Sequence, residues 1–381
     1  MSYLYQRRSP YFAQIAGGSE ALGVQELIRL GASRAEPAYR GVHFSADRTA
    51  LYRIVYHSRL LTRVLAPLVQ FDCPDEYALY DFAYHRMDWM DFMRVEDTFA
   101  IFATVANSRI NHSQYASLKL KDALVDQFRD RTGDRPSVER ETPDVWFNLH
   151  IERNRATISL DVSGGSLHRR GYRVEAGKAP MQETVAAAVL ELSGWAGETS
   201  LYDPMCGSGT LLAEALIRAS NLPAGYFRKK WGVPFLPDFD AYLWDKVRQQ
   251  GDEQVVVPLQ GLVAGSDRDE RVIHMAQQNL RPLPGGNSTP LYVSDFRDLG
   301  YLEDMTIVCN PPYGVRMGDL QTLGHVYRMF GDFLKQRCKG STAYIYCGTR
   351  ELISDLGLKP AFKKPLVNGP LDGRLVKLEL F

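Results

Sequence analysis

The sequence has no excess charge of either sign and few cysteines. Its 381 residues include 45 basic and 45 acidic side chains. A chain without net positive charge does not bind nucleic acid by bulk charge alone, so any such surface depends on where the basic residues are placed. The five cysteines form no C-x-x-C pair. This spacing argues against a metal site or a disulfide framework and favours a reducing compartment.

Long apolar segments are also missing. No window approaches the roughly 18 consecutive apolar residues of a membrane-spanning helix, and the first residues lack the apolar stretch of a signal peptide. We therefore expect a cytoplasmic protein without a membrane span. Hydrophobic residues make up 45% and charged residues 24%, which is typical of folded chains. At about 150 residues per domain, the length predicts two or three domains.

The first 163 residues predict two small α+β units. In the first unit, residues 11–16 and 41–46 have strand-like patterns, whereas residues 19–30 and 47–66 have helical periodicity. In the second, which begins near residue 65, the following segments predict a strand, a helix and a hairpin of two strands: 98–106, 113–133, 145–152 and 156–164.

From about residue 180 the pattern changes to strands that alternate with helices, which is typical of a parallel α/β sheet. Strands are predicted at 199–203, 262–267, 290–295, 305–310, 341–348 and 374–381, and helices at 182–194, 209–220, 269–280 and 325–337. An aromatic and charged insertion separates the first two strands. It contains Arg228-Lys229-Lys230, which is either a solvated run or an RNA contact.

The strongest local motif is the segment 203–210, Asp-Pro-Met-Cys-Gly-Ser-Gly-Thr, between a predicted strand and a predicted helix. Small residues there allow a ligand to approach the backbone and the helix N-terminus. A dinucleotide loop requires a third glycine, but Leu212 occupies that position, and the acidic residue expected about 20 positions later is missing. A tight turn without a ligand is the other alternative.

Acidic residues end the next two strands. Asp267 is placed to accept both hydroxyl groups of an adenosyl ribose, although it would also serve as the N-cap of the following helix. Asp295 and Phe296 are a carboxylate and an aromatic ring that could hold and cover an adenine. The alternative for Ser294-Asp295 is a simple turn.

The fourth strand ends in Asn310-Pro311-Pro312-Tyr313-Gly314. Two prolines fix the backbone and remove two donors. The Asn310 amide oxygen and a backbone carbonyl can then accept both hydrogens of a planar amino group, while Tyr313 stacks on its ring. Together with the acidic strand ends, the motif predicts an S-adenosylmethionine-dependent methyltransferase that acts on an exocyclic amine. We found no Ser-His-Asp elbow, P-loop or metal-ligand spacing.

These motifs, with the segment LHRRGYR before them, resemble the bacterial THUMP-domain 23S rRNA guanine-N2 methyltransferases. The resemblance covers nearly the whole chain. It implies a Rossmann-like class I methyltransferase domain with a mostly parallel seven-stranded α/β sheet, preceded by α+β ferredoxin-like and THUMP domains. The implied boundaries are 1–58 for the ferredoxin-like domain, 59–163 for THUMP, 164–180 for a linker and 181–381 for the methyltransferase.

The resemblance also implies roles for single residues. Those expected around S-adenosyl-L-methionine are Asp203, Gly207, Gly209, Asp267, Asp295, Phe296, Gln182, Glu183 and Thr184. Asn310 and Tyr313 would hold the target base, with the Pro311 carbonyl as the second acceptor. An acidic residue is common after the motif, but this chain has residues 315–318 as Val-Arg-Met-Gly.

The substrate expected from the resemblance is a guanine N2 amine in 23S rRNA, in a loop or flipped out of its stack. The candidate RNA-binding residues are Arg109, Lys119, Lys121, Arg169, Arg170 and Arg173. Alternatives are a tRNA guanine-N2 methyltransferase, an N6-adenine DNA methyltransferase and a non-catalytic RNA-binding or ribosome-assembly factor.

Overall fold

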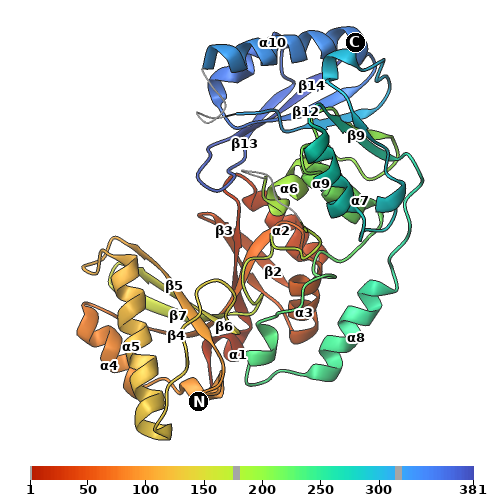
Figure 1. The fold of residues 1–381 in the computed structure, drawn as a ribbon. Coiled ribbons are helices and arrows are strands. Elements are labelled where there is room, and N and C mark those ends of the chain that lie inside the picture. Colours follow the sequence, from red (N-terminus) through yellow and green to blue (C-terminus); the bar gives the residue numbers. More distant parts are fainter. Residues whose placement is uncertain (1, 175–180, 314–319) are drawn as a thin grey trace.

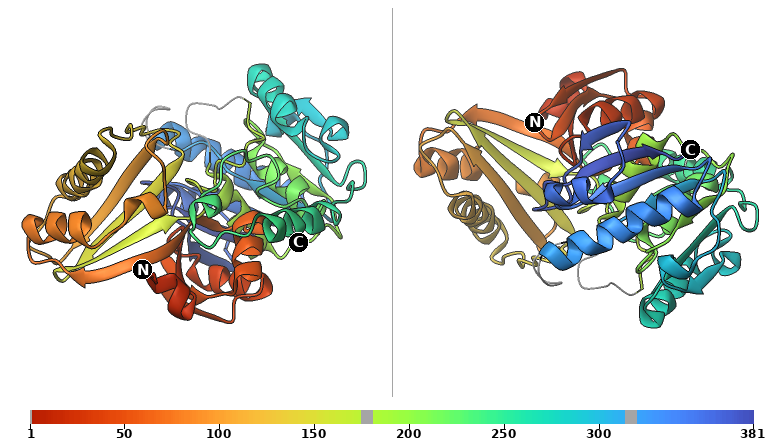
Figure 2. Two further views of the ribbon diagram at one scale, coloured as in Figure 1. Left: turned by 90° about the horizontal axis from the view of Figure 1, so that it is seen from below. Right: turned by 90° about the horizontal axis from the view of Figure 1, so that it is seen from above.

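Two seven-stranded sheets form the framework of the molecule (Figure 1). The structure is a computed structural model that describes residues 2–174, 181–313 and 320–381. The sheet of the N-terminal half has the order β2-β3-β1-β4-β7-β6-β5, and that of the C-terminal half has the order β10-β9-β8-β11-β12-β14-β13. In both views of Figure 2, residues 75–160 lie at one end of the molecule and the C-terminal half lies at the other.

The N-terminal sheet combines both α+β units. Its strands are β1 (Pro10–Ile15), β2 (Arg34–Ala38), β3 (Gly41–Ser45), β4 (Leu61–Asp72), β5 (Phe99–Ala106), β6 (Val145–Glu152) and β7 (Arg155–Asp161). Its helices are α1 (Leu4–Arg8), α2 (Glu20–Arg29), α3 (Arg48–His57), α4 (Glu76–His85) and α5 (Ser113–Thr132). The predicted β6–β7 hairpin and the long helix α5 are both present, whereas α1, α4 and β2 were not predicted.

The long strand β4 joins the two units, because it pairs with β1 on one side and with β7 on the other. The prediction of one helix over residues 47–66 was therefore wrong beyond His57, where α3 ends. Glu26 of α2 gives the physical reason. Its carboxylate accepts hydrogen bonds from Ser58 Oγ at 2.6 Å and from the backbone N–H of Arg59 at 2.8 Å. These bonds hold the chain in an extended conformation after α3.

The C-terminal half has the predicted parallel sheet. Its strands are β8 (Leu201–Asp203), β9 (Val263–Asp267), β10 (Leu291–Val293), β11 (Thr306–Cys309), β12 (Thr342–Cys347), β13 (Phe362–Pro365) and β14 (Arg374–Glu379). The first five are parallel, and β14 runs antiparallel between β12 and β13. This arrangement confirms the predicted fold class, although β13 was not predicted.

Helices cover both faces of this sheet. They are α6 (Glu183–Ser193), α7 (Thr210–Ala219), α9 (Glu270–Leu280) and α10 (Leu320–Arg337). The apolar sides of α6, α7 and α9 belong to the main hydrophobic core, whereas α10 buries residues such as Phe330 and Phe333 in a second core on the opposite face. The central strands are buried on both faces, as expected for a parallel sheet.

The insertion between β8 and β9 attaches the C-terminal half to the first α+β unit. Its helix α8 (Ala241–Asp252) lies along α3 (Figure 1). The Tyr56 hydroxyl donates a hydrogen bond to Asp252 at 2.7 Å, and Trp244 packs edge-on against Tyr52. Aromatic packing of this kind resists separation of the two halves. The boundaries predicted at residues 58, 163 and 180 stay predictions.

Neither a metal cluster nor a membrane helix is found in the described parts of the chain. All five cysteines are free and buried. No group of three or more histidine, cysteine or acidic side chains is placed to hold a metal ion among the described residues. Within the same ranges, every helix is too short or too polar to cross a bilayer.

Candidate active site

The carboxyl ends of β8 and β11 meet where the strand order of the sheet reverses. From β8 the chain continues outward through β9 and β10, and then returns to β11 on the other side of β8. Ligands of open α/β sheets bind in the crevice at such a point. Asp203 is the last residue of β8, and Asn310 follows the last residue of β11. The topology therefore brings the two predicted motifs to the same edge.

The two glycines of the loop after β8 have different functions. Both have positive φ values, 52° at Gly207 and 81° at Gly209, which disfavour other residues. A Cβ atom at Gly209 would lie 3.2 Å from Ala276 Cβ, so this glycine permits close packing of α7 against α9. A Cβ atom at Gly207 would meet none of the described atoms within 4 Å. Gly207 thus leaves an open backbone surface that a ligand can approach.

Asp203 is a buried carboxyl group, exposed by only 1%. Its Oδ1 accepts a hydrogen bond from the backbone N–H of Met205 at 3.1 Å. Burial raises the pKa of Asp203 to about 8, and the negative charge of Asp267 adds to this effect, although the Met205 N–H opposes it. Asp203 has no cationic partner among the described residues. Its carboxyl group therefore holds a proton at neutral pH.

Asp267 connects β9 to the glycine loop. Its Oδ2 accepts from the N–H of Gly207 at 3.0 Å, and its Oδ1 accepts from the N–H of Asp269 at 3.1 Å. The alternative that Asp267 is the helix N-cap was wrong, because Asp269 is the N-cap of α9 and accepts from the N–H of Arg271. Both carboxylate oxygens of Asp267 retain further lone pairs. Contact with a ribose stays a prediction.

The structure gives Asp295 and Phe296 local contacts. Asp295 accepts two hydrogen bonds of 2.9 Å from the Arg297 guanidinium and caps the 3-10 helix Phe296–Asp298, as the turn alternative predicted. These bonds hold the pKa of Asp295 below its usual range. Phe296 is 6% exposed and packs edge-on against Phe330. Their contacts with an adenine stay predictions.

The Asn310 side chain has an unsatisfied acceptor. Its Oδ1 is buried and has no hydrogen-bond partner among the described residues. Such an atom costs about 1–3 kcal/mol unless a ligand supplies a donor. The Tyr313 ring lies over Gly348, where a Cβ atom would be only 2.5 Å from the ring, and meets Tyr346 edge-on. Residues 314–318, including Gly314 of the motif, lie outside the described ranges.

Asn368, between β13 and β14, belongs to the site although the sequence analysis missed it. It is 6% exposed, and its Oδ1 accepts from the backbone N–H of Gln182, the N-cap of α6, at 3.2 Å. Burial raises the pKa of Tyr313, and hydrogen bonds with Asn368 and Asn310 lower it in part. Asn368 thus ties the chain between β13 and β14 to the start of α6. A single asparagine in a hairpin has no sequence signal that would have identified it.

The start of α6 faces the glycine loop, as the cofactor prediction requires. Glu183 accepts a hydrogen bond from Arg173 Nε at 2.9 Å, and the same guanidinium donates to Thr210 Oγ1 at 3.0 Å and to Ser208 Oγ at 3.3 Å. The Thr184 hydroxyl is buried without a partner in the described ranges. Arg173 therefore ties the start of α6 to the glycine loop, and its predicted RNA contact remains a prediction.

The prediction that Arg170 binds RNA was wrong. Its side chain is 1% exposed and forms two hydrogen bonds to the buried Glu214, with Nε–Oε1 at 3.2 Å and Nη2–Oε2 at 3.3 Å. It also donates to backbone carbonyls, including those of Leu167 and Arg59. Burial lowers the pKa of Arg170, but the Glu214 charge outweighs this and keeps the guanidinium protonated. The residue is part of the core.

The other predicted RNA contacts lie at or near the surface. Arg169 and Arg109 are exposed. Lys119 lies over the Tyr80 ring at 5.2 Å, and Lys121 forms an ion pair of 2.5 Å with Asp122. Of these four residues, Arg169 lies in the linker, next to the C-terminal half. RNA contact stays a prediction for each of these residues.

Family models match three segments of the chain. Residues 10–65 match the RlmL ferredoxin-like domain, residues 75–161 the THUMP domain, and residues 170–377 the RMKL-like methyltransferase domain. The last match covers more than half of the chain. The chain belongs to the RMKL-like methyltransferase family. The predicted family, RNA-binding THUMP domain and cofactor S-adenosyl-L-methionine are thereby confirmed.

Bacterial proteins align with nearly the whole chain. The chain is 41% identical over 373 residues to the protein described as "Putative RNA methyltransferase slr0064" from Synechocystis sp., with 98% of this chain and 97% of that protein covered. It is 37% identical to the ribosomal RNA large subunit methyltransferase K/L of Syntrophotalea carbinolica, covering 97% of this chain and 53% of that protein. The chain thus spans about half the length of the K/L relative.

Solved structures share the whole architecture. The crystal structure of SMU.472 complexed with SAH has a TM-score of 0.84 at 24% identity, with 98% of both chains covered. The structure of a predicted N6-adenine-specific DNA methylase from Listeria monocytogenes has a TM-score of 0.81 at 25% identity and covers 98% of this chain and 96% of that one. These similarities support the fold over nearly the full length.

Proposed function

We propose that this methyltransferase transfers a methyl group to the exocyclic N2 amine of a guanine in 23S rRNA. The observation that carries this proposal is the Oδ1 atom of Asn310, which is buried without a hydrogen-bond partner among the described residues and lies at the strand-order switch, beside the glycine loop. An amide oxygen accepts hydrogen bonds and therefore fits an amino group. The name of the Syntrophotalea carbinolica relative supports ribosomal RNA as the substrate. An RNA substrate also favours the cytoplasm as the location.

The residues around the open face of Gly207 fit S-adenosylmethionine. This cofactor supplies an electrophilic methyl group on a sulfonium. Asp203 would face the cationic methionine part, and Asp267 would accept the ribose hydroxyls. Thr184 has a buried hydroxyl that a polar ligand atom can satisfy.

The target amine would be held by Asn310 and the Pro311 carbonyl. Two acceptors favour the geometry and the positive charge that develop as the amine nitrogen attacks the methyl group. The Tyr313 ring, which lies over Gly348, would stack on the guanine. Alignment of amine and methyl could supply about 7–11 kcal/mol of the barrier without a covalent intermediate.

Because the pKa of Asp203 is raised, we predict that pH has opposite effects on stability and on affinity for S-adenosylmethionine. Its pKa of about 8 lies above its usual value, so the folded apoprotein binds this proton more tightly than the unfolded chain. The resulting stabilisation is complete only below the usual carboxyl pKa of about 4, falls progressively as pH rises above it, and is fully lost once pH has passed about 8. A cationic cofactor requires the ionised carboxylate, so its affinity should rise over the same range. Below pH 8 we expect a loss of up to about tenfold per pH unit.

Calorimetry of S-adenosylmethionine binding between pH 6.5 and 9 tests this coupling. Buffers with different ionisation enthalpies should report release of a proton on binding at pH 7. The control is Asp203→Asn, which cannot ionise and should have a nearly flat pH profile. Equal pH dependence in the variant and the wild type would show that another group is responsible.

The function itself is tested with methyl-labelled S-adenosylmethionine. The protein is incubated separately with unmodified 23S rRNA, with tRNA and with duplex DNA, and labelled nucleosides are identified after digestion. We expect N2-methylguanosine in the rRNA. The same nucleoside in tRNA alone would show that the substrate is tRNA and that the reaction is the one proposed. Methyladenine in DNA would overturn the proposal.

A second series uses ribosomal subunits and assembly particles as substrates. If label appears only in particles, the reaction is the one proposed and the substrate is the assembled particle, not naked RNA. Cofactor binding without label in any RNA, particle or DNA would favour the non-catalytic binding factor.

A further inference from the structure

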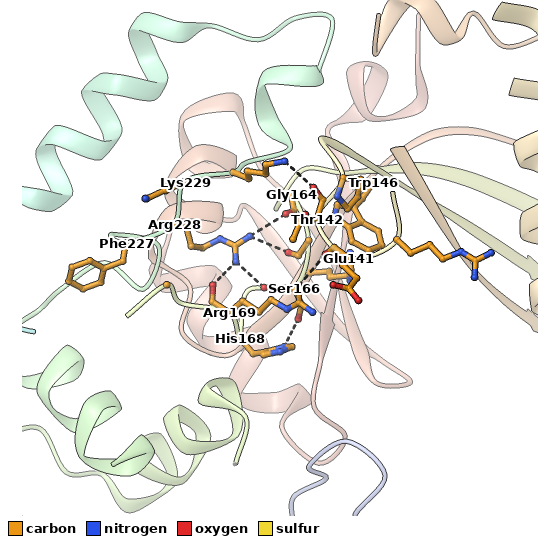
Figure 3. Close-up of a pocket in the computed structure, with 16 residues that line it drawn as sticks. Glu141, Thr142, Trp146, Gly164, Ser166, His168, Arg169, Phe227, Arg228 and Lys229 are labelled. Carbon is orange, nitrogen blue, oxygen red and sulfur yellow. Dashed lines mark hydrogen bonds between the residues drawn. The ribbon is translucent and has the colours of Figure 1, made fainter. Parts of the chain in front are cut away.

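A basic pocket lies where the THUMP unit, the linker and the insertion meet, far from the catalytic motif in sequence. We call it the junction pocket (Figure 3), a cavity of about 460 Å³. Its walls come from Arg63 of β4, residues 140–146 before and within β6, residues 164–171 of the linker and residues 227–230 of the insertion. Four parts of the chain that are distant in sequence thus create one surface.

Arg228 fixes the shape of this pocket. Figure 3 shows its guanidinium surrounded by backbone carbonyls. Nη1 donates to the carbonyls of Ser166 and Arg169 at 2.9 and 2.8 Å, and Nη2 donates to that of Ser163 at 2.9 Å. Burial lowers the pKa of Arg228 to about 10, so it remains charged at neutral pH. Because these donors bind backbone carbonyls, Arg228 holds the loop of residues 163–169 in place. Its charge adds to the positive potential of the pocket.

Three other cations of the pocket, Arg140, Arg169 and Lys229, are exposed, and none of them has a carboxylate partner among the described residues. Arg169 Nη1 donates to the backbone carbonyl of Glu141 at 3.2 Å. By contrast, Lys230 is paired with Asp144 at 2.9 Å. Glu141 is the acidic residue that lines the pocket. In a chain whose total charge is zero, this is a local excess of positive charge.

The pocket also offers an aromatic surface and a path to the active site. Trp146 is half-buried in its wall, and the Arg63 guanidinium lies 4.6 Å from its ring centre. A neighbouring pocket shares His168, Arg169 and Gly171 with it and extends to Gln182 and to Arg173, which donates to Thr210 after the glycine loop. Exposed cations beside an aromatic ring match the phosphates and bases of single-stranded RNA better than an acidic protein surface.

We propose that the junction pocket binds backbone phosphates of the RNA substrate through Arg140, Arg169 and Lys229. This inference rests on the proposed RNA substrate and adds a phosphate site that spans the THUMP unit, the linker and the insertion. Arginine and lysine donate charge-assisted hydrogen bonds to phosphate oxygens.

The test compares two triple variants in filter binding to unmodified 23S rRNA between 50 and 200 mM KCl. The first is Arg140→Ala, Arg169→Ala and Lys229→Ala. The matched control, Lys246→Ala, Lys339→Ala and Lys359→Ala, removes three exposed cations elsewhere on the surface. Loss of three phosphate contacts should reduce the slope of log Kobs against log salt by about 2–3 and weaken binding by about tenfold or more. Affinity for S-adenosylmethionine should not change in either variant.

The outcomes are distinct. A slope and affinity equal to those of the control variant would overturn the junction pocket as a phosphate site. Weakening by the same factor in both variants would also overturn it, because binding would then depend on charge anywhere on the surface. Failure of the proposed function is visible separately as absence of label in the wild type. If the label appears in tRNA, the same two variants are compared on that tRNA.

Discussion

Replacing Asn310 by alanine is expected to lower kcat by about 10²–10³-fold, which corresponds to a loss of about 3–4 kcal/mol in transition-state binding. The reason is geometric. The Oδ1 atom is buried and lacks a partner in the described ranges, so its acceptor capacity is available to the target amine. Because the oxygen interacts most strongly as charge develops on nitrogen, the loss should appear mainly in kcat. The measurement is steady-state methyl transfer to the labelled RNA.

Three controls make this result interpretable. Asn310→Asp keeps an oxygen acceptor but removes the Nδ2 donor, so its loss should be smaller than that of the alanine variant. Asn287→Ala changes an exposed asparagine in a 3-10 helix and should be neutral. Calorimetry with S-adenosylmethionine checks that the alanine variant is folded. Near-normal turnover in a folded Asn310→Ala protein would remove Asn310 from the mechanism.

The C-terminal sheet could be predicted from sequence because its signals are local. Each buried parallel strand is a short apolar run that ends in a polar residue, and each helix has its own periodicity. The ends of β8 and β11, with Asp203 and Asn310, could therefore be located before their partners were known. β13 carries lysines on an exposed edge, and its sequence gives little indication of a strand.

Long-range contacts explain most of the errors. The segment after Ser58 continues the helical periodicity, but the carboxylate of Glu26, about 30 positions earlier, binds the chain at residues 58–60, and β1 and β7 pair with the following residues as β4. The same limit applies to the linker. Arg169 and Arg170 are adjacent and chemically identical, yet one is exposed and the other is buried against Glu214 of α7. Burial of a charge depends on its partner, which the local sequence does not identify.

The Arg170–Glu214 pair leads to the second large prediction. Glu214→Ala is expected to lower the free energy of unfolding by about 3–5 kcal/mol, because it leaves a charged guanidinium buried without its counter-ion. Arg170→Ala should have a similar cost, since Glu214 would remain buried close to the negative charge of Glu183. Denaturant unfolding followed by tryptophan fluorescence measures both values.

Variants of the same pair separate charge from hydrogen bonding. Glu214→Gln keeps an acceptor of similar size but removes the charge, so its cost should lie between those of wild type and Glu214→Ala. As a control, Asp332→Ala breaks the exposed Lys335–Asp332 pair on α10 and should change stability by less than about 1 kcal/mol.

The double replacement of Arg170 by Met and Glu214 by Leu decides what the pair contributes. If charge compensation were its whole contribution, the apolar pair would restore wild-type stability. The guanidinium also donates to the carbonyls of Ser58, Arg59 and Leu167, and these acceptors would be left unsatisfied. We therefore expect only partial recovery, with a remaining loss of about 1–3 kcal/mol. Full recovery would show that the three carbonyls contribute nothing. Partial recovery would mean that the hydrogen bonds from Arg170 to backbone carbonyls of the first α+β unit and of the linker stabilise the fold in addition to its ion pair with α7.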